Sequence, residues 1–263
     1  MSLIGISSLS ILRGVLNMLS KTKKLVLAAG SVGLLAGGAQ AALSTGDIAF
    51  IGFNADGEDG FAIVALTDIT AGEEIYFRDD EWDGTAFGTG EGEFLWTAPN
   101  LTAGAVVTFV TDAGGLSTSS VGSTSAEGSF GGDMGISSGG ETIFAYQGTS
   151  NTPSTFLAAI GSDSSGIQDT LTGTGLVLGT TAVSLGGDID VAEYTGDRDT
   201  ESDFADYLAL IGDTNNWNIV TGGSGDQSGE VLPFNTTAFV VPEPSSLALL
   251  ALGGLAMARR RRG

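Results

Sequence analysis

The 263-residue chain contains no cysteine and no histidine, and these two absences exclude several kinds of chemistry. Without cysteine there is no disulfide framework, no thiol nucleophile and no thiolate metal site. Without histidine there is no imidazole base, no Ser-His-Asp triad and no histidine-bound zinc or haem. Carboxylates are therefore nearly the only strong metal-binding or acid–base groups left to the chain.

Basic residues are also scarce, and most of them lie at the two ends of the chain. Eight of the ten fall within the first 24 or the last five residues. Only Arg78 and Arg198 lie between these clusters. This distribution indicates that most of the positive charge belongs to targeting signals rather than to a folded domain.

The N-terminal segment has the layout of a secretory signal peptide. Lys21–Lys24 precede an apolar run over 25–38, and the small residues Ala39 and Ala41 then frame a cleavage site. We predict a signal helix in residues 1–41, recognised by the Sec translocon and cleaved after Ala41. Met18 is an alternative start that gives a conventional short basic region. A membrane anchor is disfavoured because the run has about 14 residues, whereas a span needs about 20.

The C-terminal segment has three parts in a fixed order. Pro242, Glu243 and Pro244 come first, an apolar or small stretch over 245–258 follows, and Arg259, Arg260, Arg261 and Arg262 come last. A helix over the middle stretch would be about 21 Å long, which makes it a short transmembrane helix. The arginines favour the cytoplasmic side.

This order of parts resembles the PEP-CTERM sorting signal of Gram-negative bacteria. The resemblance covers about 22 residues and implies recognition by exosortase, a membrane protease. It also implies export across the inner membrane, transient anchoring through the C-terminal segment alone, and a final place at the cell surface or in an extracellular matrix, often beside exopolysaccharide. We assign residues 241–263 to this signal. A plain C-terminal anchor is the alternative.

The remaining segment, 42–240, is a strongly acidic domain. It holds 30 of the 31 acidic residues but only two basic ones, which gives a formal charge of −28. This charge argues against nucleic acid or anionic lipid as a partner, because Lys and Arg supply most of the affinity for phosphates. It favours solubility and the attraction of divalent cations.

The acidic domain has the pattern of an all-β protein, and we predict an antiparallel β-sandwich of about ten strands with one short helix. The helix is expected over 201–211, with Thr200 as its N-cap. The Gly/Ser/Thr-rich segment 112–140 is expected to be a long surface loop or an irregular edge. The opening Gly46–Phe50 and the run Gly52–Gly57 loosely resemble a lamin-tail-like or immunoglobulin-like module of exported bacterial proteins. The strands are expected at 47–54, 61–67, 74–78, 92–97, 105–111, 141–147 and 155–160, and more weakly at 181–185, 189–194, 217–220 and 236–241.

One short segment between two strong strands has the composition of a calcium loop. Asn54, Asp56, Glu58 and Asp59 place oxygen side chains around glycines, as Ca²⁺ requires. The alternative is a hairpin turn, which the same residue types favour. Ca²⁺ is the one cofactor that the sequence leaves open.

A second acidic cluster follows Arg78, and its residues are Asp79, Asp80, Glu81 and Asp83. These carboxylates repel one another unless a cation or Arg78 offsets them. An exposed acidic loop is the alternative to a site.

The sequence favours a non-enzymatic exported protein with a structural or adhesive role near exopolysaccharide, and we assign no catalytic residue. A hydrolase that uses two carboxylates remains an alternative. A polysaccharide-binding protein that uses exposed Trp82, Trp96 or Trp217 is another.

Overall fold

The computed structural model describes residues 42–111, 115–128, 131–164, 167, 170–222 and 226–242. All of them belong to one of the two units into which the chain divides, Gln40–Gly263. The predicted signal helix, the predicted transmembrane helix and most of the sorting signal lie outside the described residues. Among those residues, no helix is both long enough and apolar enough for a membrane span.

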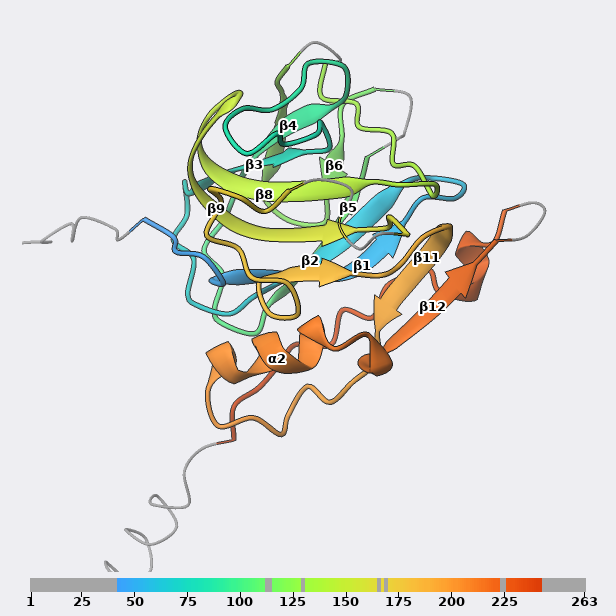
Figure 1. The fold of residues 1–263 in the computed structure, drawn as a ribbon. Helices are drawn as coiled ribbons and strands as arrows, with labels where there is room; N and C mark the ends of the chain where they lie inside the picture. The colour runs from blue at the N-terminus through green and yellow to red at the C-terminus, as the bar shows by residue number, and fades with distance from the viewer. Residues whose placement is uncertain are drawn as a thin grey trace, which may run out of the picture. The chain divides into compact units, whose positions relative to one another are not determined.

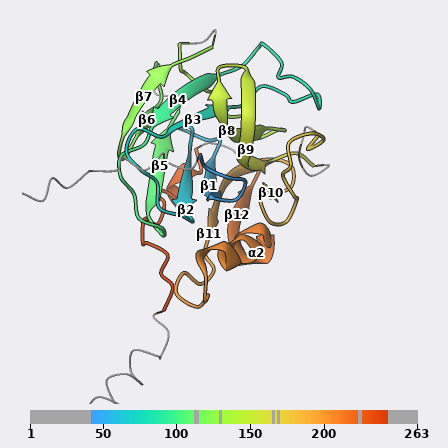
Figure 2. The ribbon, with the colours of Figure 1, turned by 90° about the vertical axis from the view of Figure 1, so that its left-hand side faces the viewer.

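Two six-stranded sheets form the body of the domain, which confirms the predicted β-sandwich (Figures 1 and 2). The first sheet has the order β12-β11-β1-β2-β5-β6, and the second has the order β10-β9-β8-β3-β4-β7. All pairings are antiparallel except β10 with β9, which is parallel. The strands are β1 Ile48–Asn54, β2 Gly60–Ala65, β3 Glu74–Arg78, β4 Glu93–Thr97, β5 Val106–Val110, β6 Thr118–Ser119, β7 Ser123–Ala126, β8 Thr142–Thr149, β9 Thr152–Gly161, β10 Ala182–Ser184, β11 Ile189–Tyr194 and β12 Trp217–Thr221.

Phenylalanine rings from both sheets fill the space between them. Phe61 of β2 lies 4.9 Å from Phe77 of β3, measured between ring centroids, and Phe109 of β5 lies 4.9 Å from the same ring. Phe94 of β4 joins this group. Both β1 and β2 are buried along their whole length. Continuous apolar runs therefore mark strands that are covered on both faces.

The outer face of the second sheet is covered by the loop 79–92, which connects β3 to β4. Trp82 and Phe87 in this loop form an isolated β-bridge and pack on Phe144, Tyr146 and Phe156. The loop is therefore held against the sheet by aromatic contacts. It carries all four acids of the second acidic cluster.

The outer face of the first sheet is covered by a short helix and by the C-terminal segment 231–241. The helix α2, Tyr207–Gly212, follows a 3₁₀ turn, Phe204–Asp206 (Figure 1). Tyr207 meets Phe239 edge to face, with ring centroids 5.0 Å apart. The C-terminal segment therefore packs as part of the domain up to the residues just before the sorting signal.

Two local predictions differ from the structure. The helix begins later than expected, because the Asp203 side chain, and not Thr200, accepts the hydrogen bond that caps the 3₁₀ turn. Residues 236–241 form no strand, because Arg198 side-chain donors satisfy carbonyls of this region in place of a neighbouring strand. Of the two readings of segment 112–140, the irregular edge agrees with the structure, because the segment contains the edge strands β6 and β7, which lack an apolar alternation.

Candidate functional site

Arg78 is the centre of a buried network of charged groups at the end of β3. Its guanidinium is 3% exposed and pairs with Asp80 and with Glu93, 3.0 Å from the nearer oxygen of Glu93. It also donates to the carbonyl of Gly88 at 2.9 Å. The Tyr146 hydroxyl donates to the Glu93 carboxylate. Arg78 thus pairs with two carboxylates, and its charge also partly offsets the burial and the neighbouring acids that raise the pKa of Glu91.

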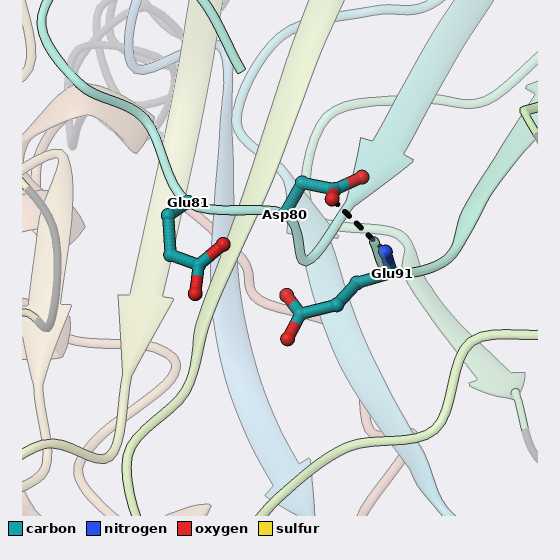
Figure 3. A group of neighbouring side chains, drawn as sticks. All are labelled: Asp80, Glu81 and Glu91. Atoms are coloured by element: carbon teal, nitrogen blue, oxygen red, sulfur yellow. Dashed lines mark hydrogen bonds between the residues drawn. The ribbon is translucent and has the colours of Figure 1, made fainter. Parts of the chain in front are cut away.

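Asp80, Glu81 and Glu91 form a compact group of carboxylates in the loop after β3. One oxygen from each lies within 4.8 Å of the other two (Figure 3). Asp80 is buried, and its Oδ1 accepts from the backbone amides of Gly90 and Glu91. Its other oxygen pairs with Arg78. The exposed Glu81 and Glu91 are thus the two members of the group whose carboxylates face solvent.

A recess of about 250 Å³ lies next to this group, and three carboxylates line it: Asp79, Glu91 and Asp133. Asp79 is only 2% exposed. Its Oδ1 and the Oδ1 of Asp133 are both buried without a hydrogen bond. Burial and the charge of Glu91 raise the pKa of Asp79 to about 8. The recess therefore brings several acids together, and the ionised form of Asp79 is disfavoured there unless a cation offsets the charge of Glu91.

Glu141 is a further buried acid at this end of the sandwich, just before β8. Its carboxylate accepts from the backbone amides of Ser137 and Thr142. Burial, the charge of Asp79 and, to a smaller extent, that of Glu91 nevertheless raise its pKa to about 9. Acids that are far apart in the sequence thus share one electrostatic environment.

The predicted calcium loop has separate partners for its oxygen atoms. Asn54 is buried and donates to the carbonyl of Glu58. Asp56 accepts from the backbone amide of Gln227 at 2.6 Å, and Asp59 accepts from that of Ile136 at 2.7 Å. Glu58 is exposed. Asp56 and Asp59 thus bind backbone amides in two different segments of the chain. Ca²⁺ binding in this loop stays a prediction.

Three of these loop residues line a second pocket, of about 430 Å³, between the first sheet and the C-terminal segment. They are Asn54, Glu58 and Asp59. Its other walls are largely apolar and include Phe109 and Phe234. The pocket is therefore distinct in chemistry from the acidic recess.

The three tryptophans are all buried, and each indole N–H donates to a backbone carbonyl. Trp96 is completely buried, while Trp82 and Trp217 are 7% and 8% exposed. Their acceptors are the carbonyls of Val121, Thr172 and Ile211, respectively. These side chains consequently present no row of exposed rings on which a sugar chain could stack.

Sequence reasoning found part of the acidic site and missed the rest. It singled out Asp79, Asp80 and Glu81, but it did not connect them with Asp133 or Glu141. Those two acids stand in or beside a Gly/Ser/Thr-rich segment, and only the folded chain brings them to the loop after β3. One sequence feature does indicate burial. Glu93 and Glu141 each stand at or just before the start of an apolar strand, and both are buried.

The comparison with protein families identifies the end of the chain. The model of the PEP-CTERM protein-sorting motif matches residues 240–262. The chain carries a PEP-CTERM sorting motif. The motif supports an exported protein that is sorted and processed by exosortase, with transient membrane anchoring before display at the cell surface. Comparisons with curated proteins and with solved structures give no match, so the lamin-tail-like resemblance stays a prediction.

The described residues end at 242 and therefore include the first three residues of the matched motif. Phe239 is 1% exposed, and its backbone amide donates to the carbonyl of Gly104. The backbone amide of Val240 donates to the carbonyl of Arg198, and its carbonyl accepts from Tyr207. The folded domain therefore continues to the first residue of the PEP-CTERM match, with no free linker between them.

Proposed function

We propose that this PEP-CTERM protein is a non-enzymatic component of the cell surface or extracellular matrix of a Gram-negative bacterium. Its acidic sandwich would have a structural or adhesive role beside exopolysaccharide. Ca²⁺ would bridge its carboxylates to acidic polymers, because two negatively charged surfaces repel each other without a cation between them.

The single observation that carries this proposal is the burial of all three tryptophans. With these rings buried, carboxylates are the main groups through which the domain could bind a partner. Polysaccharide-degrading and sugar-binding surfaces rely on exposed aromatic rings or on a cleft. Here the aromatic rings hold loops to the sheets instead. What the domain offers to a partner is a surface of carboxylates, which suits cation-mediated association better than stacking.

The acidic recess is a feature that favours a carboxylate-dependent hydrolase, because Asp79, Glu91 and Asp133 all line it. Its volume, however, is below the range of about 300–1,000 Å³ that is usual for organic ligands. The deepest acid, Asp79, is 2% exposed, so a glycosidic bond could not reach it without a rearrangement. The recess is therefore better suited to an ion than to a sugar chain.

Binding to an immobilised polyuronate such as alginate tests the proposal. The purified full chain is passed over the surface with millimolar Ca²⁺ or with a chelator, and released reducing ends are measured in parallel. We expect retention only with Ca²⁺ and no reducing ends above the buffer control. Release of reducing ends would establish an enzyme that cleaves the polymer and would reject the non-enzymatic role, while a lack of retention with Ca²⁺ would reject the adhesive role.

A further inference from the structure

We propose that the recess beside the loop 79–92 is a binding site for one Ca²⁺ ion, with Asp79, Glu91 and Asp133 as its protein ligands. This site differs from the loop that the sequence predicted at Asn54–Asp59. It is a property of the folded domain and does not depend on whether the protein associates with polysaccharide.

The first argument is an unpaired oxygen in a buried carboxylate. Asp79 is 2% exposed and lines the recess, yet its Oδ1 has no hydrogen bond. The Oδ1 of Asp133, which also lines the recess, is likewise buried without a hydrogen bond. Buried polar atoms in folded proteins nearly always have partners. Two unpaired carboxylate oxygens from separate segments, both belonging to residues of one recess, indicate a cation that pairs with them.

The second argument is that both basic side chains in the described part of the chain pair with groups other than these three acids. Among the residues that the structure describes, Arg78 and Arg198 are the only basic ones. Arg78 pairs with Asp80 and Glu93. Arg198 is bound to the carbonyls of Asn235 and Thr237 in the C-terminal segment. The charge of Arg78 offsets only part of the rise in the pKa of Glu91, which burial and the charges of Glu81 and Asp80 cause. A bound divalent cation would supply the remaining compensating charge.

The third argument concerns the kind of cation. The recess offers carboxylate oxygens, and the chain has neither histidine nor cysteine, which together favour a hard cation over zinc or copper. A volume of about 250 Å³ leaves room for an ion that keeps several waters. Ca²⁺ accepts six to eight oxygens in variable geometry, whereas Mg²⁺ requires a nearly regular octahedron. Ligands from irregular segments therefore suit Ca²⁺ better.

Such an ion would connect segments that are distant in the sequence. Asp79 follows β3, Glu91 precedes β4, and Asp133 lies between β7 and β8. Because a ligand that binds only the folded state stabilises it, Ca²⁺ would raise the stability of the domain. It would also fix both ends of the loop 79–92 to the segment before β8.

The test is Ca²⁺ titration of the purified full chain by calorimetry, together with thermal unfolding in Ca²⁺ or chelator and no polysaccharide present. We expect one tight site and a higher melting temperature with Ca²⁺. Asp79→Asn and Asp133→Asn should each weaken binding by roughly tenfold or more, since the loss of even an outer-shell partner costs that much. Asp83→Asn, an exposed change in the same loop, is the matched control and should bind like the wild type.

Two further variants distinguish this recess from the neighbouring carboxylates. Glu81→Gln removes an acid of the compact group in Figure 3, and Asp56→Asn removes one from the loop predicted by sequence. Both should bind Ca²⁺ more tightly than Asp79→Asn does. Circular dichroism in chelator confirms that each variant is folded. The proposal is overturned if the wild type binds no Ca²⁺, if Asp79→Asn and Asp133→Asn bind it normally, or if Glu81→Gln or Asp56→Asn abolishes binding while Asp79→Asn does not.

Discussion

The Tyr146 hydroxyl on β8 donates a hydrogen bond to the Glu93 carboxylate on β4, across the intervening strand β3. Glu93 also accepts from the Ser150 hydroxyl at 2.7 Å and pairs with Arg78. A buried carboxylate with three such partners connects strands β3, β4 and β8. It also holds Arg78, which in turn binds the loop 79–92 through Asp80 and Gly88.

The first prediction concerns this network. Replacing Glu93 by alanine should lower the free energy of unfolding by about 3–5 kcal/mol, because it leaves Arg78 with one buried partner fewer. Tyr146→Phe removes only a hydroxyl and should cost about 1–3 kcal/mol. Urea denaturation of both variants measures the two values. A loss below about 1 kcal/mol for Glu93→Ala would mean that the network contributes little.

The second prediction concerns the segment that leads into the PEP-CTERM motif. Arg198 donates to the carbonyls of Asn235 and Thr237 and lies 4.9 Å from the centroid of the Phe239 ring. Arg198→Lys keeps the charge but loses the planar fork, so it should cost about 2–3 kcal/mol. Limited proteolysis should then cut within 231–241 faster than in the wild type.

Asp197→Asn is the control for this prediction, since Asp197 is the exposed neighbour of Arg198. It should leave both the unfolding free energy and the proteolysis rate unchanged. Equal cleavage in Arg198→Lys and the wild type would show that other contacts hold the segment in place.

The third prediction concerns Gly52 in β1, where the Phe234 ring packs closely against the backbone. A Cβ atom at Gly52 in β1 would lie 2.8 Å from the Phe234 ring, which is closer than carbon atoms normally approach. Gly52→Ala should therefore displace Phe234 and cost about 1–3 kcal/mol of stability. Gly229→Ala, where a Cβ would meet nothing within 4 Å, is the matched control. Equal stability of the two variants would show that Phe234 does not pack closely against Gly52.

The fourth prediction concerns pH. Burial and the nearby charges of Asp79 and Glu91 raise the pKa of Glu141 from 4.5 to about 9. Between these values the folded chain holds a proton that the unfolded chain has lost. The stabilisation is complete below the lower value and is lost as the pH rises through the upper one. The loss should approach about 1.4 kcal/mol per pH unit as an upper limit.

Urea denaturation in chelator across this pH window measures the effect. Glu141→Gln keeps the shape of the side chain but cannot titrate, so its stability should fall less steeply as the pH rises. Parallel slopes for Glu141→Gln and the wild type would show that Glu141 does not hold this proton.

The sequence was sufficient to predict the strands whose side chains are apolar on one or both faces. The run before Asn54 and the run after Gly60 became β1 and β2, because burial on both faces leaves a continuous apolar pattern. It was not sufficient for β6 and β7, which are short edge strands of Thr and Ser. It also mistook 236–241 for a strand, because the pattern does not reveal that Arg198 binds the carbonyls there.

The acidic recess shows a second limit of sequence reasoning. A dense acidic run such as Asp79–Asp83 is visible in the sequence, but its burial is not. Asp79 is buried in a recess that the end of the loop before β4 and the segment 133–135 line with it. Asp133 reaches the recess through a segment that has little pattern of its own. Local composition therefore indicated an acidic loop, and only the tertiary arrangement indicated a site.

The most direct test of the cation site is a crystal structure of the protein grown with Ca²⁺ and soaked with a lanthanide, whose anomalous signal marks the ion. We expect one strong peak in the recess, within bonding distance of Asp79, Glu91 and Asp133. A recess without a peak would contradict this expectation, as would a peak only in the loop Asn54–Asp59.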